Sequence, residues 1–348
     1  MIVLTLTSCN EFLTQTPRSD LTAAEYWKTE RDVQNWMNGI YNGMVSGLAP
    51  NIRWWGEGRT DNLFPTIYGQ GPAYQKNALT SSVGTTDWSD LYTIIARCNL
   101  ALKYVPGMEN LTDIKKEQFY AEIHGLRALM YFYIMRLWGD CPLILESWDL
   151  SYETRYNPRA SVTEVAKAIE DDIDTSIGYF LSNGSRQTSV HYFNLSAAYA
   201  LKMDFLAWEG RYDEIPGVYA DFMAQGTFTL TATDTEWKNI FITPDESNES
   251  IFALAWDTNH STSTYSTYAS AIGFSGSNAN FSLGRNMYAL MVQDTMDIRL
   301  RGVVKRTDYN GDLIASNAPI YGATGGSNNN VQRIYKFLPM GAGYGFFV

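Results

Sequence analysis

Apolar residues separated by three and four positions dominate the segment 112–138, which contains no proline and a single glycine. This period matches one face of an α-helix, and at 1.5 Å per residue the helix would be roughly 40 Å long. Gly139 and Pro142 follow, and they favour a stop because glycine adopts the left-handed conformation that ends helices and proline cannot continue one. The pattern predicts a long core helix whose apolar stripe comprises Ile123, Leu126, Met130, Tyr133, Ile134 and Leu137.

Two arginines, Arg127 and Arg136, lie within this otherwise apolar helix. A guanidinium that leaves water needs a hydrogen-bonding partner, because an unpaired buried charge is costly. We therefore expect each arginine to reach a carboxylate or a helix-end carbonyl.

The same period recurs along the first two-thirds of the chain. It predicts helices over 32–46, 88–104 and 161–181, and a helix–turn–helix over 194–225. Small alanines in the last pair allow close helix approach, as in tetratricopeptide repeats, and a glycine marks its turn. Three antiparallel helix pairs result, so the expected fold is mainly α, with a tetratricopeptide-like helical-repeat scaffold.

Two long segments, 47–86 and 257–286, lack any sustained period and combine aromatic residues with glycine, serine and asparagine. Loops of this length inside compact domains are uncommon and usually functional. After residue 225 the composition shifts to threonine, serine, asparagine and glycine, with a strand-like run at 251–256 and an Asn310-Gly311 hairpin signal. The sequence therefore predicts a small, loop-rich C-terminal part.

The composition limits which classes of molecule this protein is expected to bind. The net charge is −11 without any basic run, which disfavours nucleic acid. No stretch approaches the roughly 18 apolar residues of a membrane span. Three scattered histidines and no cysteine pair at ligand spacing argue against a zinc site, and we expect no cofactor and no metal.

Aromatic residues make up 14% of the chain, and those outside the core could stack on the apolar faces of sugar rings. The hydroxyl groups of a sugar then need polar partners. Glu57 and Asp61, flanked by tryptophans, would also suit the carboxylate pair of a glycosidase. Carboxylates beside aromatic rings bind sugar hydroxyls without chemistry as well, so we expect binding and no enzymatic activity.

The N-terminus has the form of a lipoprotein signal. An apolar run ends in Leu6-Thr7-Ser8-Cys9, and a polar, proline-containing stretch follows. In such a lipobox, cleavage before the cysteine leaves a thiol that carries diacylglycerol. We expect lipidation at Cys9; the alternative is a buried cysteine near the start of a soluble protein.

Two motifs carry a family resemblance. The run R-A-L-x-Y-F-Y-x-x-R-L-W-G-D-x-P-L-I at 127–144 resembles the signature helix of the SusD/RagB family of nutrient-binding outer-membrane lipoproteins. The pattern W-x-x-L-Y-x-x-I-x-R-x-N at 88–99 is similar to another helix of that family. The resemblance implies a lipid-anchored protein at the cell surface that passes oligosaccharides to a SusC-like TonB-dependent transporter.

On this resemblance we expect a signal end and tether over 1–20, a helical-repeat domain over 21–225 and an incomplete ligand-binding part over 226–348. Family members continue further, so we expect a fragment. The alternatives are a protein-interaction adaptor built on helical repeats and a glycoside hydrolase. Position in the two irregular segments selects the candidate ligand-binding residues, which are Trp54, Trp55, Arg59, Asp61, Asn62, Tyr68, Tyr74, Tyr265, Tyr268 and Phe274.

Overall fold

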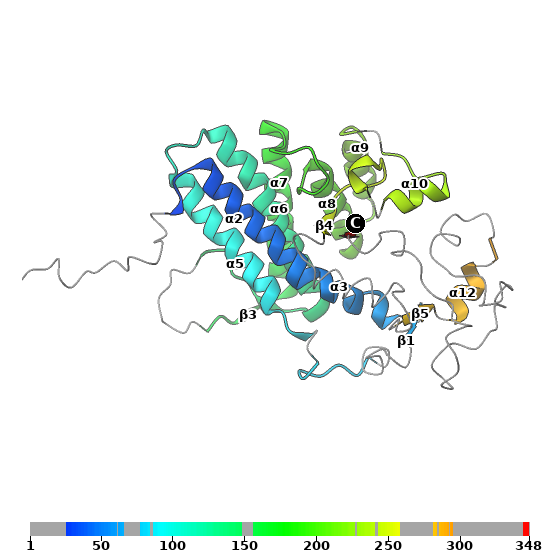
Figure 1. Cartoon of the computed structure of the whole chain (residues 1–348). Helices are drawn as coiled ribbons and strands as arrows, with labels where there is room; N and C mark the ends of the chain where they lie inside the picture. The colour runs from blue at the N-terminus through cyan, green and yellow to red at the C-terminus, as the bar shows by residue number, and fades with distance from the viewer. Residues whose placement is uncertain are drawn as a thin grey trace, which may run out of the picture.

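Helices dominate the computed structural model (Figure 1). It describes residues 26–60, 62–65, 77–83, 86–147, 156–226, 228–240, 243–257, 281–283, 285–291, 293–294 and 344–347. The helices longer than eight residues are α2 (Glu30–Gly43), α5 (Ser89–Tyr104), α6 (Asp113–Trp138), α7 (Val162–Asn183), α8 (Leu195–Trp208) and α9 (Ile215–Met223).

The long predicted helix is α6, and both of its ends follow from sequence. The Thr112 hydroxyl accepts a hydrogen bond from the Lys115 amide, and the chain leaves the helix at Gly139, where φ is 70°. Leu126 and Met130 are fully buried, because α6 packs against α5 on one side and α7 on the other. The prediction of a core helix is confirmed.

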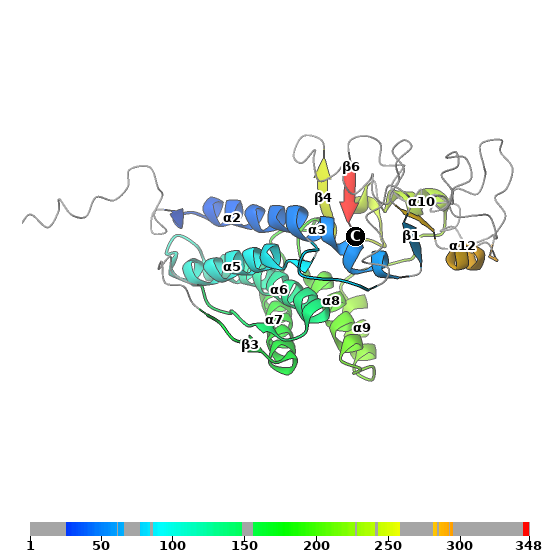
Figure 2. The ribbon, with the colours of Figure 1, turned by 90° about the horizontal axis from the view of Figure 1, so that it is seen from below.

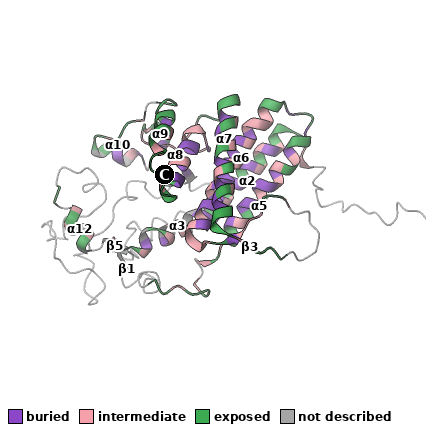
Figure 3. Cartoon of the chain, turned by 180° about the vertical axis from the view of Figure 1, so that it is seen from behind, coloured by how far each residue is buried: buried purple, intermediate pink, exposed green. Residues whose placement is uncertain are grey.

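Successive helices form the expected antiparallel pairs α2/α5, α6/α7 and α8/α9. Trp27, just before α2, stacks on Tyr104 at the end of α5, with ring centroids 5.7 Å apart. Near the start of α6, Gln118 donates to the Asn183 carbonyl at the end of α7. Figure 3 shows the buried residues gathered where these helices meet, with exposed residues on the outer face of α7. The helical-repeat fold is confirmed.

A tight approach to α6 explains its single glycine. A Cβ atom at Gly125 would overlap the ring of Phe193, which belongs to the connection between α7 and α8 and is 3% exposed. Glycine is otherwise unfavourable within a helix. Its presence here follows from the space that the phenylalanine ring occupies.

We predict that Gly125→Ala lowers the free energy of unfolding by about 1–2 kcal/mol, because overpacking costs about 1–3 kcal/mol and outweighs a helix-propensity gain of about 1 kcal/mol. The matched control is Gly178→Ala in α7, where a Cβ atom would meet nothing within 4 Å. The free energy of unfolding of that variant should rise by about 0.5–1 kcal/mol. Urea denaturation measures both, and a shift of equal sign in the two variants would contradict the packing argument.

The first irregular segment begins as helix, which corrects the sequence expectation. A π-helical turn, η2 (Met44–Leu48), continues from α2 and leads into α3 (Ala49–Trp55) and a 3₁₀ turn, η3 (Glu57–Arg59). Pro50 does not prevent this, since it lies in the first turn of α3, where its missing N–H is no loss. Gly47 fits because a Cβ atom at this position would lie 2.6 Å from the Cβ atom of Asp90 in α5.

The described strands form three two-stranded antiparallel sheets, and β4 begins at Leu254, three residues after the start of the strand-like run predicted at 251–256. Short helices α10 (Asp234–Asn239) and α12 (Arg285–Met291) and the 3₁₀ turns η5 (Val105–Gly107) and η6 (Pro244–Glu246) complete the described elements. The hairpin predicted at Asn310-Gly311 lies outside the described residues. The strand pairs are β1 (Leu63–Pro65) with β5 (Phe281–Leu283), β2 (Cys141–Pro142) with β3 (Arg159–Ala160), and β4 (Leu254–Asp257) with β6 (Tyr344–Phe347).

Candidate functional site

The two irregular segments meet at the β1–β5 pair. Leu63 lies opposite Leu283 and Pro65 opposite Phe281 in the antiparallel register. In Figure 2, β1 and α12 lie at the same end of the molecule, beyond α3. Because β1 belongs to the first segment and β5 to the second, backbone hydrogen bonds join segments more than 200 positions apart. We call this region, with the residues of η3 beside it, the junction.

Aromatic packing attaches α3 to the end of α6 next to the junction. The Trp55 ring lies 5.7 Å from Trp138 and 6.2 Å from Tyr133, measured between centroids. The Trp138 indole N–H donates to the Thr86 carbonyl at 3.2 Å. Trp55 is partly buried by these contacts, so the ring positions α3.

Trp54 has only 8% of its surface exposed. A stacking platform needs an open ring face, and at this exposure the indole offers none. The expectation that Trp54 stacks on a ligand therefore does not fit the structure. The physical reason is that residues 49–55 form a helix, which turns one of the two adjacent tryptophans inward.

Arg59 and Asn62 are the described polar candidates at the junction. The Arg59 guanidinium donates to Asn77 Oδ1 through Nε at 3.0 Å and Nη2 at 2.9 Å. The backbone N–H of Asn62 donates to the Thr60 hydroxyl at 3.3 Å. Asn77 has a positive φ of 50° and was missed at the sequence level, where only its place in an irregular segment could have indicated it.

The remaining sequence candidates lie outside the described residues, and their ligand or anchoring roles stay predictions. The same holds for the side chain of Glu57, the proposed partner of Asp61 in a glycosidase pair. These candidates are Cys9, Asp61, Tyr68, Tyr74, Tyr265, Tyr268 and Phe274.

Metal and thiol chemistry find no support in the described part of the chain. Its histidine, cysteine and acidic side chains nowhere gather in threes as a metal site requires. Cys98 is fully buried, and burial raises its thiol pKa to about 12. Nucleophilic chemistry needs a thiolate, so Cys98 acts as the small buried hydrophobe that its place beside a helical stripe predicts.

One buried ion pair joins α6 to α7, and a hydrogen bond from the same arginine extends it to α5. Arg127 of α6 binds Asp172 of α7 through Nε and Nη2, each at 2.7 Å, and its Nη1 donates to Asn99 of α5 at 2.7 Å. His124 Nδ1 lies 2.6 Å from Asp172 Oδ1. Burial would raise the pKa of Asp172, but the hydrogen bonds from Arg127 and His124 outweigh it and lower the pKa below its usual value. The partner expected for Arg127 is confirmed.

A second buried pair fixes the connection between α7 and α8. Arg186 donates to Glu122 through Nε at 2.9 Å and Nη2 at 3.1 Å, and the Tyr41 hydroxyl donates to the same carboxylate at 2.7 Å. Both charged side chains are at most 3% exposed. Burial raises the pKa of Glu122, and the bonds from Arg186 and Tyr41 offset this only in part.

The side chain of Arg136 is more exposed to solvent than that of Arg127, the other arginine of α6 discussed above. It pairs with Asp204 of α8 at 3.2 Å, and its guanidinium lies over the Phe132 ring, 4.0 Å from the centroid. The expectation of a carboxylate partner is confirmed here as well.

Comparison with known proteins settles the family. The SusD-like family, described as starch-binding and associating with the outer membrane, matches residues 11–203. The chain belongs to the SusD-like family. SusD-like protein P38 of Formosa agariphila is 26% identical over 247 residues, which cover 70% of this chain and 47% of that protein. The chain thus spans about half the length of this SusD-like relative.

Solved structures share the fold. NanU of B. fragilis superposes with a TM-score of 0.71 at 18% identity, over 92% of this chain and 72% of that one. A laminarin-binding SusD-like protein gives a TM-score of 0.66 at 17% identity, over 80% and 67% of the two chains. Among the helices described here, none is both long and apolar enough to cross a membrane.

Proposed function

We propose that this SusD-like protein captures oligosaccharides at the cell surface and delivers them to a SusC-like TonB-dependent transporter, without catalysis. The observation that carries the proposal is the β1–β5 pairing, which brings the two aromatic-rich segments together beside Arg59 and Asn62. The family description, starch-binding and associating with the outer membrane, agrees with it, as does the fold shared with a laminarin-binding protein.

The ligand would bind at the junction. Aromatic rings stack on the apolar face of a sugar, and amide and guanidinium groups bind its hydroxyls. The side chains of Asn62 and of the Arg59–Asn77 pair supply such groups. Trp54 and Trp55 would support this surface from below through their packing. We assign stacking to the aromatic residues of the two segments, Tyr68, Tyr74, Tyr265, Tyr268 and Phe274, and hydroxyl binding also to Asp61.

Attachment would proceed through a lipid on Cys9, with residues 1–20 as signal end and tether. The helical domain, 21–225, would carry the scaffold, and residues 226–348 would supply the second ligand-binding segment. Docking to the transporter would use the helical-repeat face. Exposed large side chains on the α8–α9 pair support such a contact; they are Trp208, Tyr212, Tyr219 and Met223.

The test is a glycan array on the full-length gene product, followed by titration of the best oligosaccharide. Removing one stacking ring, Tyr265→Ala, should weaken binding by about 1–3 kcal/mol, and Arg59→Ala should weaken it as well. Tyr212→Ala is the matched control, because it removes an exposed tyrosine from the helical pair.

In cells, Cys9→Ala should abolish lipid labelling.

Two outcomes would favour the rival functions. Shortening of the oligosaccharide by the parent protein, abolished in Glu57→Gln, would indicate a glycoside hydrolase. Capture of a transporter by a protein that binds no glycan would indicate an adaptor. Parental affinity in both Tyr265→Ala and Arg59→Ala would move the ligand site away from the junction.

A further inference from the structure

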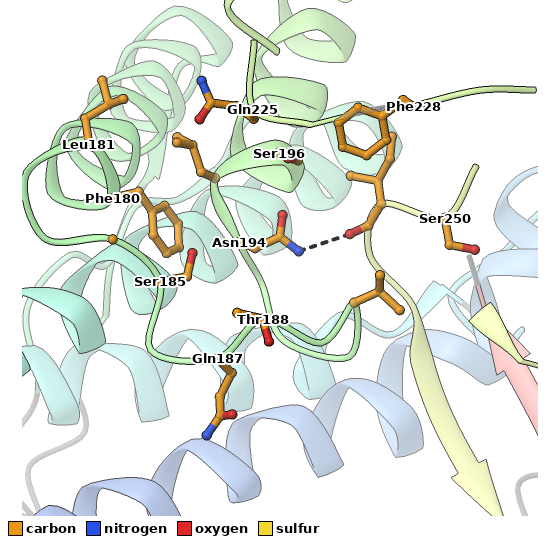
Figure 4. Close-up of a pocket in the computed structure, with 14 residues that line it drawn as sticks. Phe180, Leu181, Ser185, Gln187, Thr188, Asn194, Ser196, Gln225, Phe228 and Ser250 are labelled. Carbon is orange, nitrogen blue, oxygen red and sulfur yellow. Dashed lines mark hydrogen bonds between the residues drawn. The ribbon is translucent and has the colours of Figure 1, made fainter. Parts of the chain in front are cut away.

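A concave surface that is separate from the junction lies where α7 ends and α8 begins (Figure 4). Its volume is about 520 Å³, and it shares no lining residue with the junction. Its far side is closed by Gln225, Phe228, Ser250 and Ile251. This volume falls within the roughly 300–1,000 Å³ that small-molecule sites occupy. We call it the α7–α8 groove.

The lining of the groove is amphiphilic and uncharged. In Figure 4, Phe180 and Phe228 stand on opposite sides, and Ser185, Thr188 and Asn194 lie between them. None of the residues that line the groove in the described part of the chain is acidic, basic or histidine. An ionic ligand would lose its hydration there without gaining a counter-charge. Apolar walls with hydroxyl and amide groups suit a ligand that is itself neutral and hydroxylated.

Hydrogen bonds hold the walls of the groove in place. The Asn194 side chain accepts from the Ala197 amide as the cap of α8, and it donates to the Ile251 carbonyl at 3.0 Å. The Arg186–Glu122 pair also ties the connection between α7 and α8, which supplies part of the lining, to α6. A binding site formed before the ligand arrives avoids the entropy cost of ordering its walls.

One buried hydroxyl at the groove is unsatisfied. Ser250 lines the groove and is 4% exposed, and its Oγ has no hydrogen-bond partner among the described residues. Buried polar groups normally have a partner, and an orphan one is costly. In Figure 4 the Ser250 side chain points away from the space between Phe180 and Phe228, so this hydroxyl is not assigned to a ligand in the groove.

We propose that the α7–α8 groove is a second binding site, specific for a neutral polyhydroxylated unit of one or two sugar rings and independent of the junction. Phe228 would contact the apolar face of the ring. The hydroxyls of Thr188 and Ser196 would bind its hydroxyl groups. This division matches the chemistry of a sugar, whose ring has one apolar face and a polar rim.

The test uses the ¹⁵N-labelled chain titrated with glucose, N-acetylglucosamine and maltose. At least one sugar should give saturable shifts of the amide signals of residues 184–196. The double variant Thr188→Val/Ser196→Ala, which removes two hydroxyls, should bind that sugar on the order of tenfold more weakly. Thr93→Val, on an exposed position of α5, is the matched control and should bind as the parent does.

The outcomes separate this site from the junction. Arg59→Ala should leave the groove titration unchanged even where it weakens oligosaccharide binding. If no sugar shifts the 184–196 signals of the parent protein, the proposal fails whatever the variants do. Equal weakening in Thr93→Val would also overturn it, because the effect would then not belong to the groove.

Discussion

Asp172→Asn is expected to lower the free energy of unfolding by about 3–5 kcal/mol, because it leaves a buried guanidinium without its counter-charge. The Arg127 side chain is only 7% exposed and meets Asp172 through two bonds of 2.7 Å. Arginine cannot neutralise itself by losing a proton. Asparagine keeps the size of the side chain but can accept only with its single carbonyl oxygen, so the charge remains uncompensated.

The neighbouring residue provides a matched control. Asp171 is 64% exposed and pairs with Lys167 on the surface of α7. Surface pairs contribute about 0–1 kcal/mol, so Asp171→Asn should change stability by less than about 1 kcal/mol. Guanidinium denaturation at pH 7 measures both variants. Similar losses in the two would show that the buried pair has no special role.

The pH dependence follows from the lowered pKa of Asp172. A carboxyl group whose pKa is lower in the folded state stabilises the protein above its unfolded pKa, about 3.9. This contribution is lost as the pH falls through the folded value. The difference in stability between the parent and Asp172→Asn should therefore shrink below about pH 4. A difference that stays constant down to pH 2.5 would contradict the assignment.

The second large effect is expected for Glu122→Gln, which should also lower the free energy of unfolding by about 3–5 kcal/mol, because Arg186 would stay charged in the interior without a counter-charge. Arg186 is 3% exposed and depends on Glu122 for two bonds. Glu214→Gln is the control, because that carboxylate is 45% exposed in its pair with Arg211. Equal losses in these two variants would rule out the buried charge as the cause.

Removal of Arg186, the other partner of this pair, should lower the free energy of unfolding less at low pH than at high pH. In Arg186→Met the remaining Glu122 can take up a proton, and burial already raises its pKa. A carboxyl group with a raised folded pKa stabilises the folded state below its unfolded pKa, and this stability is lost as the pH rises through the folded value. Arg186→Met should therefore be less destabilised at pH 5 than at pH 8, whereas Glu122→Gln should show no such gain. Thermal denaturation at the two pH values measures the difference.

Features that depend on neighbours in sequence were predictable from the sequence alone. Helix starts at Thr112 and Ser161 depend on a side chain and an amide three positions later, and both caps are present. The end of α6 at Gly139 depends on one glycine. The burial of Cys98 follows from its place beside a helical stripe. These features depend on backbone geometry and on the spacing of apolar residues over a few neighbouring positions, so they can be predicted from residue types and their spacing.

Features that depend on distant contacts were decided only by the tertiary structure. The sequence indicated that Arg127 needs a carboxylate or a helix-end carbonyl, but the choice of Asp172 arises from the packing of α6 against α7. Trp54 and Trp55 are adjacent in an apparently irregular segment, yet a helix buries the first and packs the second on Trp138. The β1–β5 pairing and the α7–α8 groove likewise join segments far apart in the chain. Such contacts depend on how the helices pack. The spacing of apolar residues and the capping residues determine where each helix begins and ends along the chain, but not which helix faces come into contact.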